Sequence, residues 1–201
     1  VVQIAKKKIA LNNKVGHAGT LDPFAEGILV LCFGEKTKEV SSIMAMKKEY
    51  LGKIKLGIET DTLDKTGEIY KTADIPDVNK SNILSVFEKF TGDIEQTPPA
   101  FSALKCNGKR LYEYARSGIR IIKKPRNITI HSLDLLEYDK SGTIIFKTIC
   151  SSGTYIRSLA ADIGRALGSL GYLEELQRLR VGDYTKDNCL SLEDLIDGNI
   201  K

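Results

Sequence analysis

The chain has 201 residues, of which 42% are hydrophobic, and its 30 Lys and Arg against 26 Asp and Glu leave a net charge of +4. This length and apolar content are enough for the core of one large domain, which excludes a disordered chain. No apolar stretch approaches the length of a transmembrane helix, so we expect no contact with a membrane.

The first half of the chain contains two predicted helices and three predicted strands, inferred from the spacing of apolar residues. The helices cover residues 1–11 and 35–46, and the strands cover residues 28–33, 47–58 and 68–71. Within the longest of these strands, alternation puts Tyr50, Gly52, Ile54 and Leu56 on one face and Leu51, Lys53 and Lys55 on the other.

The second half reads as helices over residues 81–90, 111–116 and 154–167 and from residue 191, with strands over residues 126–138 and 143–150. Ser81, Thr154 and Ser191 are the expected N-caps. Residues 173–183 are ambiguous between strand and helix. Because β-α-β alternation is poor and successive strands tend to pair, we predict one mixed α+β domain over residues 1–201, built around a largely antiparallel sheet.

The cysteines and histidines show no spacing typical of metal ligands, so we expect no metal site. They are Cys32, Cys106, Cys150, Cys189, His17 and His131. Scattered thiols without a secretory signal favour a reducing, cytoplasmic location.

A basic segment covers residues 105–126 and holds eight Lys or Arg against one acid, a charge of +7 that leaves −3 on the rest of the chain. Such a concentration of cations attracts phosphates, which indicates a polyanionic partner. A solvated charged face is the alternative, and composition does not decide between the two.

Asp22, Tyr50 and Arg157 are polar residues that the periodicity of their segments does not require. Pro23 holds Asp22 in an extended conformation on a glycine-rich loop. Arg157 falls in the first turn of a predicted helix, where the macrodipole disfavours a cation unless an anion is near, and Asp22 is the candidate partner. A turn-forming Asp and a surface Arg are the simpler interpretations of each residue alone.

Four blocks resemble, in order, the successive motifs of the TruB-type tRNA pseudouridine synthases. They are HAGTLDPFAEGILVLCFGEKTK, KEYLGKIKLGIETDTLDKTGEI, PPAFSALKCNGKRLYEYARSG and SSGTYIRSLAADIGRALG, and the match runs over about residues 14–182. The resemblance implies the pseudouridine synthase fold and the isomerisation of uridine 55 in the T loop of tRNA. Because this reaction exchanges no electrons or groups, it implies no cofactor.

The resemblance also implies roles for individual residues. Asp22 would be the essential carboxylate, acting as a nucleophile or as a base, Tyr50 would stack on the flipped base, and Arg157 would pair with Asp22. The expected substrate contacts are His17, Tyr155 and Leu176 around the uracil, and Lys14, Lys105, Lys109 and Arg110 at the phosphates.

The chain departs from the family pattern in three places. A Lys-Pro-x-Gly-x-Thr-Ser block that usually opens the family is absent and the first residue is Val1, so we expect an N-terminal truncation. Residues after Ser191 leave no room for an RNA-binding appendage of the PUA type, which favours the stand-alone bacterial enzymes, a monomer and no required protein partner. Gln177 and Leu179 replace the more usual Arg and Thr beside Leu176.

Two other functions compete with this interpretation. A glycoside hydrolase would pair Asp22 with Asp61 or Asp64, but these two residues lie in what reads as a hairpin turn, and a neutral sugar needs no basic segment. A tRNA-binding module without catalysis would use the basic segment and Tyr50 equally well. Product formation that depends on Asp22 distinguishes an enzyme from such a module.

Reversing the charge of Lys109 and Arg110 should weaken tRNA binding and flatten its salt dependence, because each phosphate contact contributes roughly one unit to the slope of log K against log salt. Titrations of tRNA at several salt concentrations measure this slope. An unchanged slope would remove the basic segment from the interface.

Overall fold

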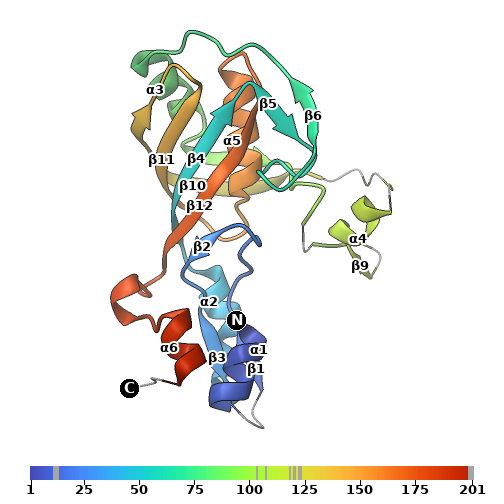
Figure 1. Cartoon of the computed structure of the whole chain (residues 1–201), viewed down its shortest axis with the longest axis vertical. Helices are drawn as coiled ribbons and strands as arrows, with labels where there is room; N and C mark the ends of the chain where they lie inside the picture. The colour runs from blue at the N-terminus through green and yellow to red at the C-terminus, as the bar shows by residue number, and fades with distance from the viewer. Residues whose placement is uncertain are drawn as a thin grey trace.

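A six-stranded sheet forms the body of the computed structural model, which describes residues 1–10, 14–102, 104–106, 108–117, 119, 121 and 124–198 (Figure 1). The strand order is β2-β12-β4-β11-β10-β7. The strands are β2 Glu26–Gly27, β4 Lys48–Leu56, β7 Gly92–Gln96, β10 Arg126–Tyr138, β11 Thr143–Cys150 and β12 Gly171–Val181. Only β2 runs parallel to its neighbour, which confirms the predicted α+β class with a largely antiparallel sheet.

One face of this sheet is covered by the helices α3 (Lys80–Lys89) and α5 (Ile156–Ala166), which share a single apolar core with the strands. The predicted alternation along β4 is confirmed, and the face that carries Tyr50, Ile54 and Leu56 is the buried one. Phe87 of α3 meets Phe146 of β11 edge to face, with ring centroids 6.4 Å apart. Non-local side-chain packing therefore fixes both helices on the sheet.

Glycines allow α5 to approach β12 closely. A Cβ atom on Gly164 would lie 2.6 Å from the backbone nitrogen of Gly171, a distance that real Cβ atoms do not show. The C-terminal end of α5 is therefore fixed against β12 by a backbone contact between helix and strand.

A smaller unit lies at the end of the molecule that carries the N-terminus (Figure 1). There β1 (Val15–His17) pairs with β3 (Leu31–Phe33), beside the 3₁₀ helix Gly34–Glu39 and α2 (Val40–Ala45). These segments share a second apolar cluster that consists of Ala18, Ile28, Cys32, Ile43 and Val181. The remaining elements at this end are α1 (Val2–Ala5), the π-helix Lys6–Ala10, the 3₁₀ helix Lys186–Asn188 and α6 (Leu192–Asp197).

Two further strand pairs flank the main sheet. β5 (Ile58–Thr60) pairs with β6 (Ile69–Thr72), and β8 (Lys105–Cys106) pairs with β9 (Lys109–Arg110), which leads into α4 (Leu111–Arg116). The predicted returning strand and the short helix of the basic segment are thus present. Residue 11, where the first predicted helix ends, lies outside the described residues.

Three predictions about element ends are wrong: the strand start at residue 28 and the N-caps Ser81 and Thr154. The strand expected over residues 28–33 begins only at Leu31, because the Ile28 N–H donates to the Arg178 carbonyl instead of continuing the β1 ladder. Asn79, not Ser81, caps α3 and accepts from the Asn82 N–H at 3.0 Å.

The α5 helix starts after Tyr155 rather than at Thr154, whose hydroxyl donates to the Ser151 carbonyl. The predicted cap at Ser191 is confirmed, since its side chain accepts from the Asp194 N–H. Most of the ambiguous segment over residues 173–183 belongs to the strand β12, which lies between β2 and β4.

In the part of the chain that the structure describes, no helix combines the length and the apolar character needed to cross a membrane.

Replacing Asn79 with Ala removes the acceptor at the start of α3, so we expect the free energy of unfolding to fall by about 1 kcal/mol. The Ser81→Ala variant is the matched control at an exposed helical position, and it should change this energy by less than about 0.5 kcal/mol. Urea unfolding measures both values. A larger loss for Ser81→Ala than for Asn79→Ala would show that Ser81, not Asn79, caps α3.

Candidate active site

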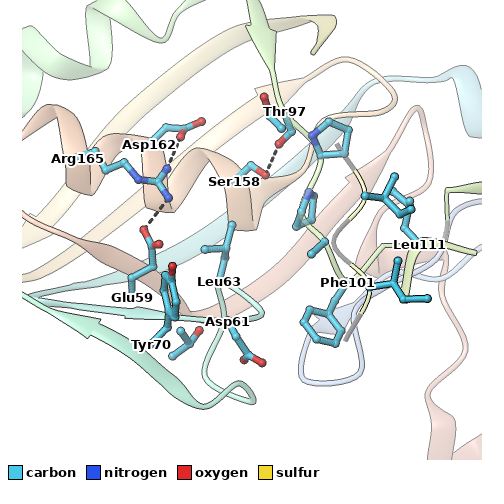
Figure 2. Close-up of a pocket in the computed structure, with 16 residues that line it drawn as sticks. Glu59, Asp61, Leu63, Tyr70, Thr97, Phe101, Leu111, Ser158, Asp162 and Arg165 are labelled. Atoms are coloured by element: carbon cyan, nitrogen blue, oxygen red, sulfur yellow. Dashed lines mark hydrogen bonds and ion pairs between the residues drawn. The ribbon is translucent and has the colours of Figure 1, made fainter. Parts of the chain in front are cut away.

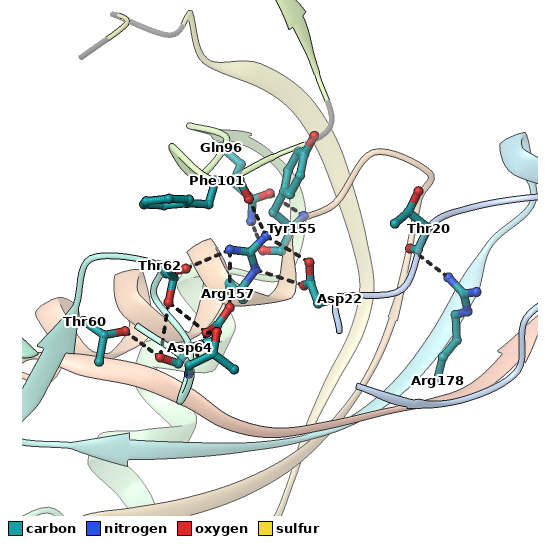
Figure 3. Close-up of polar contacts among 11 residues, drawn as sticks. Thr20, Asp22, Thr60, Thr62, Asp64, Gln96, Phe101, Tyr155, Arg157 and Arg178 are labelled. Atoms are coloured by element: carbon teal, nitrogen blue, oxygen red, sulfur yellow. Dashed lines mark hydrogen bonds and ion pairs between the residues drawn. The ribbon is translucent and has the colours of Figure 1, made fainter. Parts of the chain in front are cut away.

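Arg157 and Asp22, which are 135 residues apart in the sequence, form a bidentate ion pair (Figure 3). The Arg157 Nε atom lies 2.9 Å from Asp22 Oδ2, and Nη2 lies 3.0 Å from Oδ1. The Arg157 side chain is only 6% exposed, whereas that of Asp22 is 31% exposed. The pair therefore combines an accessible carboxylate with a buried cation, and the anion offsets the unfavourable macrodipole at the start of α5.

The other donors of Arg157 bind two separate segments. Nη1 donates to the Thr62 carbonyl and Nη2 to the Phe101 carbonyl, both at 2.8 Å. Since the guanidinium is planar and rigid, these bonds leave it little freedom to rotate. The orientation of the Asp22 carboxylate is thus set by the β5–β6 hairpin and by the segment around Phe101.

Asp64 is a second carboxylate partner of Arg157, with its Oδ2 atom 3.4 Å from Nη1. Its Oδ1 atom accepts three hydrogen bonds, from the Thr62 hydroxyl and from the hydroxyl and amide of Thr66. Asp64 is 4% exposed. Sequence reasoning missed this role because Asp64 lies in a short segment rich in Asp, Thr and Gly, which reads as a solvent-exposed turn.

Gln96 fixes the residue that precedes α5. Its side-chain amide donates to the Tyr155 carbonyl at 3.0 Å and accepts from the Tyr155 N–H at 2.7 Å. One turn later, the Ser158 hydroxyl donates to the Thr97 carbonyl at 2.8 Å. The residues before Phe101 are therefore attached to the same helix start that carries Arg157.

Tyr155 lies beside the ion pair (Figure 3), and burial raises the pKa of its hydroxyl above the usual value. The positive charges of Arg126 and Arg157 act in the opposite direction without cancelling the shift. The phenol is therefore neutral at physiological pH and is able to donate a hydrogen bond.

Tyr50 is 8% exposed, and burial is also the main reason why its pKa is raised. The charge of Arg178 opposes this shift, and the charge of Asp22 adds to it. Tyr50 and Asp22 therefore share one electrostatic environment, in which the tyrosine hydroxyl stays neutral.

The remaining predicted site residues are less closely gathered. His17 is half-buried in β1, and its Nδ1 atom is buried with no hydrogen-bond partner among the described residues. Leu176 is 7% exposed on β12, opposite Gly52, and Lys14 is exposed just before β1. The backbones of Lys105, Lys109 and Arg110 form β8 and β9, but their side chains lie outside the described residues.

A cavity of about 650 Å³ lies between α5, the β5–β6 hairpin and residues 97–121 (Figure 2). Its apolar lining includes Leu63, Tyr70 and Phe101, and its charged lining consists of Glu59, Asp61, Asp162 and Arg165. Arg165 is occupied by ion pairs with Glu59 at 2.6 Å and with Asp162 at 2.7 Å. Among the described lining residues the carboxylates outnumber the cations, and Asp22 does not belong to this lining.

No set of three or more His, Cys, Asp or Glu side chains among the described residues has an arrangement that would hold a metal ion. Cys32 and Cys150 are buried and reduced, and burial raises the pKa of the Cys150 thiol to about 11. The side chains gathered around Asp22 include carboxylates, guanidinium groups and phenols (Figure 3).

Replacing Asp64 with Ala should lower the free energy of unfolding by more than about 2 kcal/mol, because three donors and part of the Arg157 charge lose their partner in a buried place. Asp61→Ala, on the same hairpin, removes one bond to the exposed Glu68 N–H and should cost less than about 1 kcal/mol. Urea unfolding compares the two variants. Equal losses would show that Asp64 is an ordinary turn residue.

Two family models match the chain. The first is described as the "TruB family pseudouridylate synthase (N terminal domain)" and covers residues 6–156. The second is described as the "tRNA pseudouridylate synthase B C-terminal domain" and covers residues 157–200. Their junction falls at the start of α5, between Ile156 and Arg157, so the two halves of the ion pair belong to different models.

Curated relatives are similar over nearly the whole chain. A protein named tRNA pseudouridine synthase B from Francisella philomiragia is 49% identical over 196 residues, which cover 96% of this chain and 65% of that relative. A protein of the same name from Clostridium perfringens (strain 13 / Type A) is 43% identical, over 94% of this chain and 64% of that relative. The chain therefore spans slightly less than two thirds of the length of these relatives.

Solved structures share the fold. A chain of "Crystal Structure of a Cbf5-Nop10-Gar1 Complex" is 29% identical with a TM-score of 0.72, over 97% of this chain and 49% of that chain. A chain of "Structure of H/ACA RNP bound to a substrate RNA containing 2'-deoxyuridine" is 26% identical with a TM-score of 0.69, over 97% and 47%. Sequence and fold thus agree, and the chain belongs to the TruB family of pseudouridylate synthases.

Proposed function

We propose that this chain isomerises uridine 55 in the T loop of tRNA to pseudouridine, with Asp22 as the essential carboxylate. The observation that carries the proposal is the bidentate pair between the accessible Asp22 and the buried Arg157, in a member of the TruB family. The name of the relatives supports tRNA as the substrate class.

The reaction breaks the N1–C1′ bond of the uridine, turns the uracil while it stays bound, and joins C5 to C1′. The hydrogen at C5 leaves as a proton and the freed N1 takes up a proton, so the product is an isomer of uridine and atoms and electrons balance without a cofactor. Asp22 has two possible roles in this sequence: it attacks the sugar or the base as a nucleophile, or it removes a sugar proton as a base.

Arg157 prepares Asp22 for either role. Two hydrogen bonds from one rigid guanidinium hold both carboxylate oxygens, and Arg157 is itself held by the carbonyls of Thr62 and Phe101. The carboxylate is therefore oriented before the nucleotide arrives, which reduces the reorganisation required in the reaction.

The target uridine must leave its stack before it reaches Asp22. An aromatic side chain offsets this cost by about 1–3 kcal/mol per base, and Tyr50 is the proposed stacking partner. Tyr155, Leu176 and His17 are the proposed contacts of the uracil. The flanking phosphates would bind Lys14 and the cations of the basic segment, Lys105, Lys109 and Arg110 among them.

The geometry argues against the glycoside hydrolase alternative. Such an enzyme needs a second carboxylate that is free to act as an acid or a base, but Asp64 is buried and both of its oxygens are engaged. Asp61 accepts the Glu68 N–H and lines the cavity that does not include Asp22.

The proposal also covers the location, the oligomeric state and the partners of the enzyme. We take residues 1–201 as a catalytic unit that acts in the cytoplasm, as a monomer and without a protein partner, as the sequence resemblance implies. The solved relatives differ in this respect, since their descriptions name a complex with Nop10 and Gar1 and an RNP.

Tritium release from a T-arm RNA labelled at C5 of uridine tests the proposal, because joining C5 to C1′ must expel that hydrogen. We expect release by the wild-type chain and a loss of at least about 10³-fold in Asp22→Asn, with RNA binding retained. Asp61→Asn, a carboxylate outside the pair, is the control and should keep the wild-type rate.

Wild-type release by Asp22→Asn would refute the central role of Asp22. Binding of the T arm without release by the wild-type chain would favour the tRNA-binding module instead.

A further inference from the structure

Arg178 is the largest side chain that is fully buried in the described part of the chain, with an exposure of 1%. A buried guanidinium usually pairs with a carboxylate, because burying an uncompensated charge is costly. Within the described ranges, Arg178 has no ion pair with a carboxylate. It donates instead to backbone carbonyls: Nε to Ile28 at 2.7 Å, Nη2 to Gly19 at 3.1 Å and Nη1 to Thr20 at 3.5 Å.

These three carbonyls belong to the two ends of the loop that carries Asp22. Gly19 and Thr20 precede Asp22, and Ile28 follows it. One planar group thus closes the loop across its base, and Figure 3 shows the contact with Thr20 on the side of Asp22 away from Arg157. Only a guanidinium offers several donors in one rigid plane, so Lys cannot reproduce this set of bonds.

The backbone of Arg178 links the same loop to Tyr50. In the register of the sheet, Arg178 lies opposite Tyr50 on β4 and opposite Gly27 on β2. Gly27 has φ +99°, and a Cβ atom there would lie 2.2 Å from the Arg178 carbonyl, so only glycine allows this approach. Arg178 therefore sets the position of both the Asp22 loop and Tyr50.

A second buried cation lies close to Arg178. Lys48 is 7% exposed and donates to the carbonyls of Met44 and Met46. Burial lowers the pKa of Lys48, and the charge of Arg178 lowers it further. Arg178 is therefore buried although a like charge is near. Its burial has to be explained by a role other than charge pairing.

We propose that Arg178 is a positioning residue for the reaction, holding the Asp22 loop in register with Tyr50. This inference rests on the proposed function. Arg157 orients the carboxylate of Asp22, whereas Arg178 sets the backbone that carries it. Its loss should lower the rate of the chemical step more than the affinity for RNA, since a displacement of about 1 Å at a reacting group costs about 10²-fold in rate.

The chain supplies a matched control two residues along β12. Arg180 is partly exposed, with 41% of its side chain accessible, and pairs with Glu49 at 2.9 Å. A shift of register lies between Arg178 and Arg180, which explains why two arginines on one strand have such different environments.

The experiment compares Arg178→Lys and Arg178→Met with Arg180→Lys and Arg180→Met. Four quantities are measured for each protein: the urea midpoint, the Kd for T-arm RNA, the single-turnover rate of tritium release at saturating RNA, and amide hydrogen exchange over residues 19–28. In Arg178→Lys we expect a Kd within about 3-fold of wild type, a rate roughly 10²-fold lower and loop amides that exchange at least about tenfold faster. The Arg180 variants should keep the wild-type rate and loop exchange.

Unchanged loop exchange in folded Arg178 variants would overturn the proposal, and so would a loss of affinity without a loss of rate. If neither Arg178 variant folds, the wild-type protein decides through exchange of the Arg178 Nε–H. Exchange through the same opening as the loop amides supports the proposal, and exchange at the rate of a free arginine refutes it. Absence of tritium release from the wild type would refute the proposed function alone, because the exchange measurements do not depend on turnover.

Discussion

The rest of the site depends on the ion pairs of the Arg157 guanidinium, which lies between Asp22 and Asp64 at the start of α5. A buried cation at the positive end of a helix is unfavourable unless anions and carbonyls surround it. Here the carboxylates come from a loop and a hairpin, and the carbonyls come from Thr62 and Phe101. These segments converge on one point because each of them supplies a partner that Arg157 requires.

The sheet provides the frame in which this convergence is possible. The close contact between Gly164 and Gly171 fixes α5 on β12, and the alternation along β4 places Tyr50 on the same covered face. Arg178 on β12 then reaches the loop from the other side. Two guanidinium groups thus bracket the Asp22 loop, one bound to its carboxylate and one to its backbone, and both leave the carboxylate accessible.

The charge of the basic segment suits the proposed RNA substrate. Arg157 and Arg178, which bind the Asp22 loop, are buried and engaged, whereas the +7 of residues 105–126 is carried by residues that precede β10, except for Arg126, its first residue. The same segment supplies Leu111, Ile119 and Ile121 to the lining of the cavity beside α5. Under the proposed function, the basic segment would bind the backbone of the nucleic acid while the target base reaches Asp22.

The sequence by itself determined the class of fold, most of the long strands, the alternation along β4 and the family, because these follow from local periodicity and from the order of four motifs. Helix starts failed where several capping residues lay close together, as at Asn79 and Ser81. Only the tertiary structure decided what Asp64 and Arg178 do. Their roles depend on partners 93 and 150 residues away, at Arg157 and Ile28, whereas local composition marks one as a turn and the other as a strand residue.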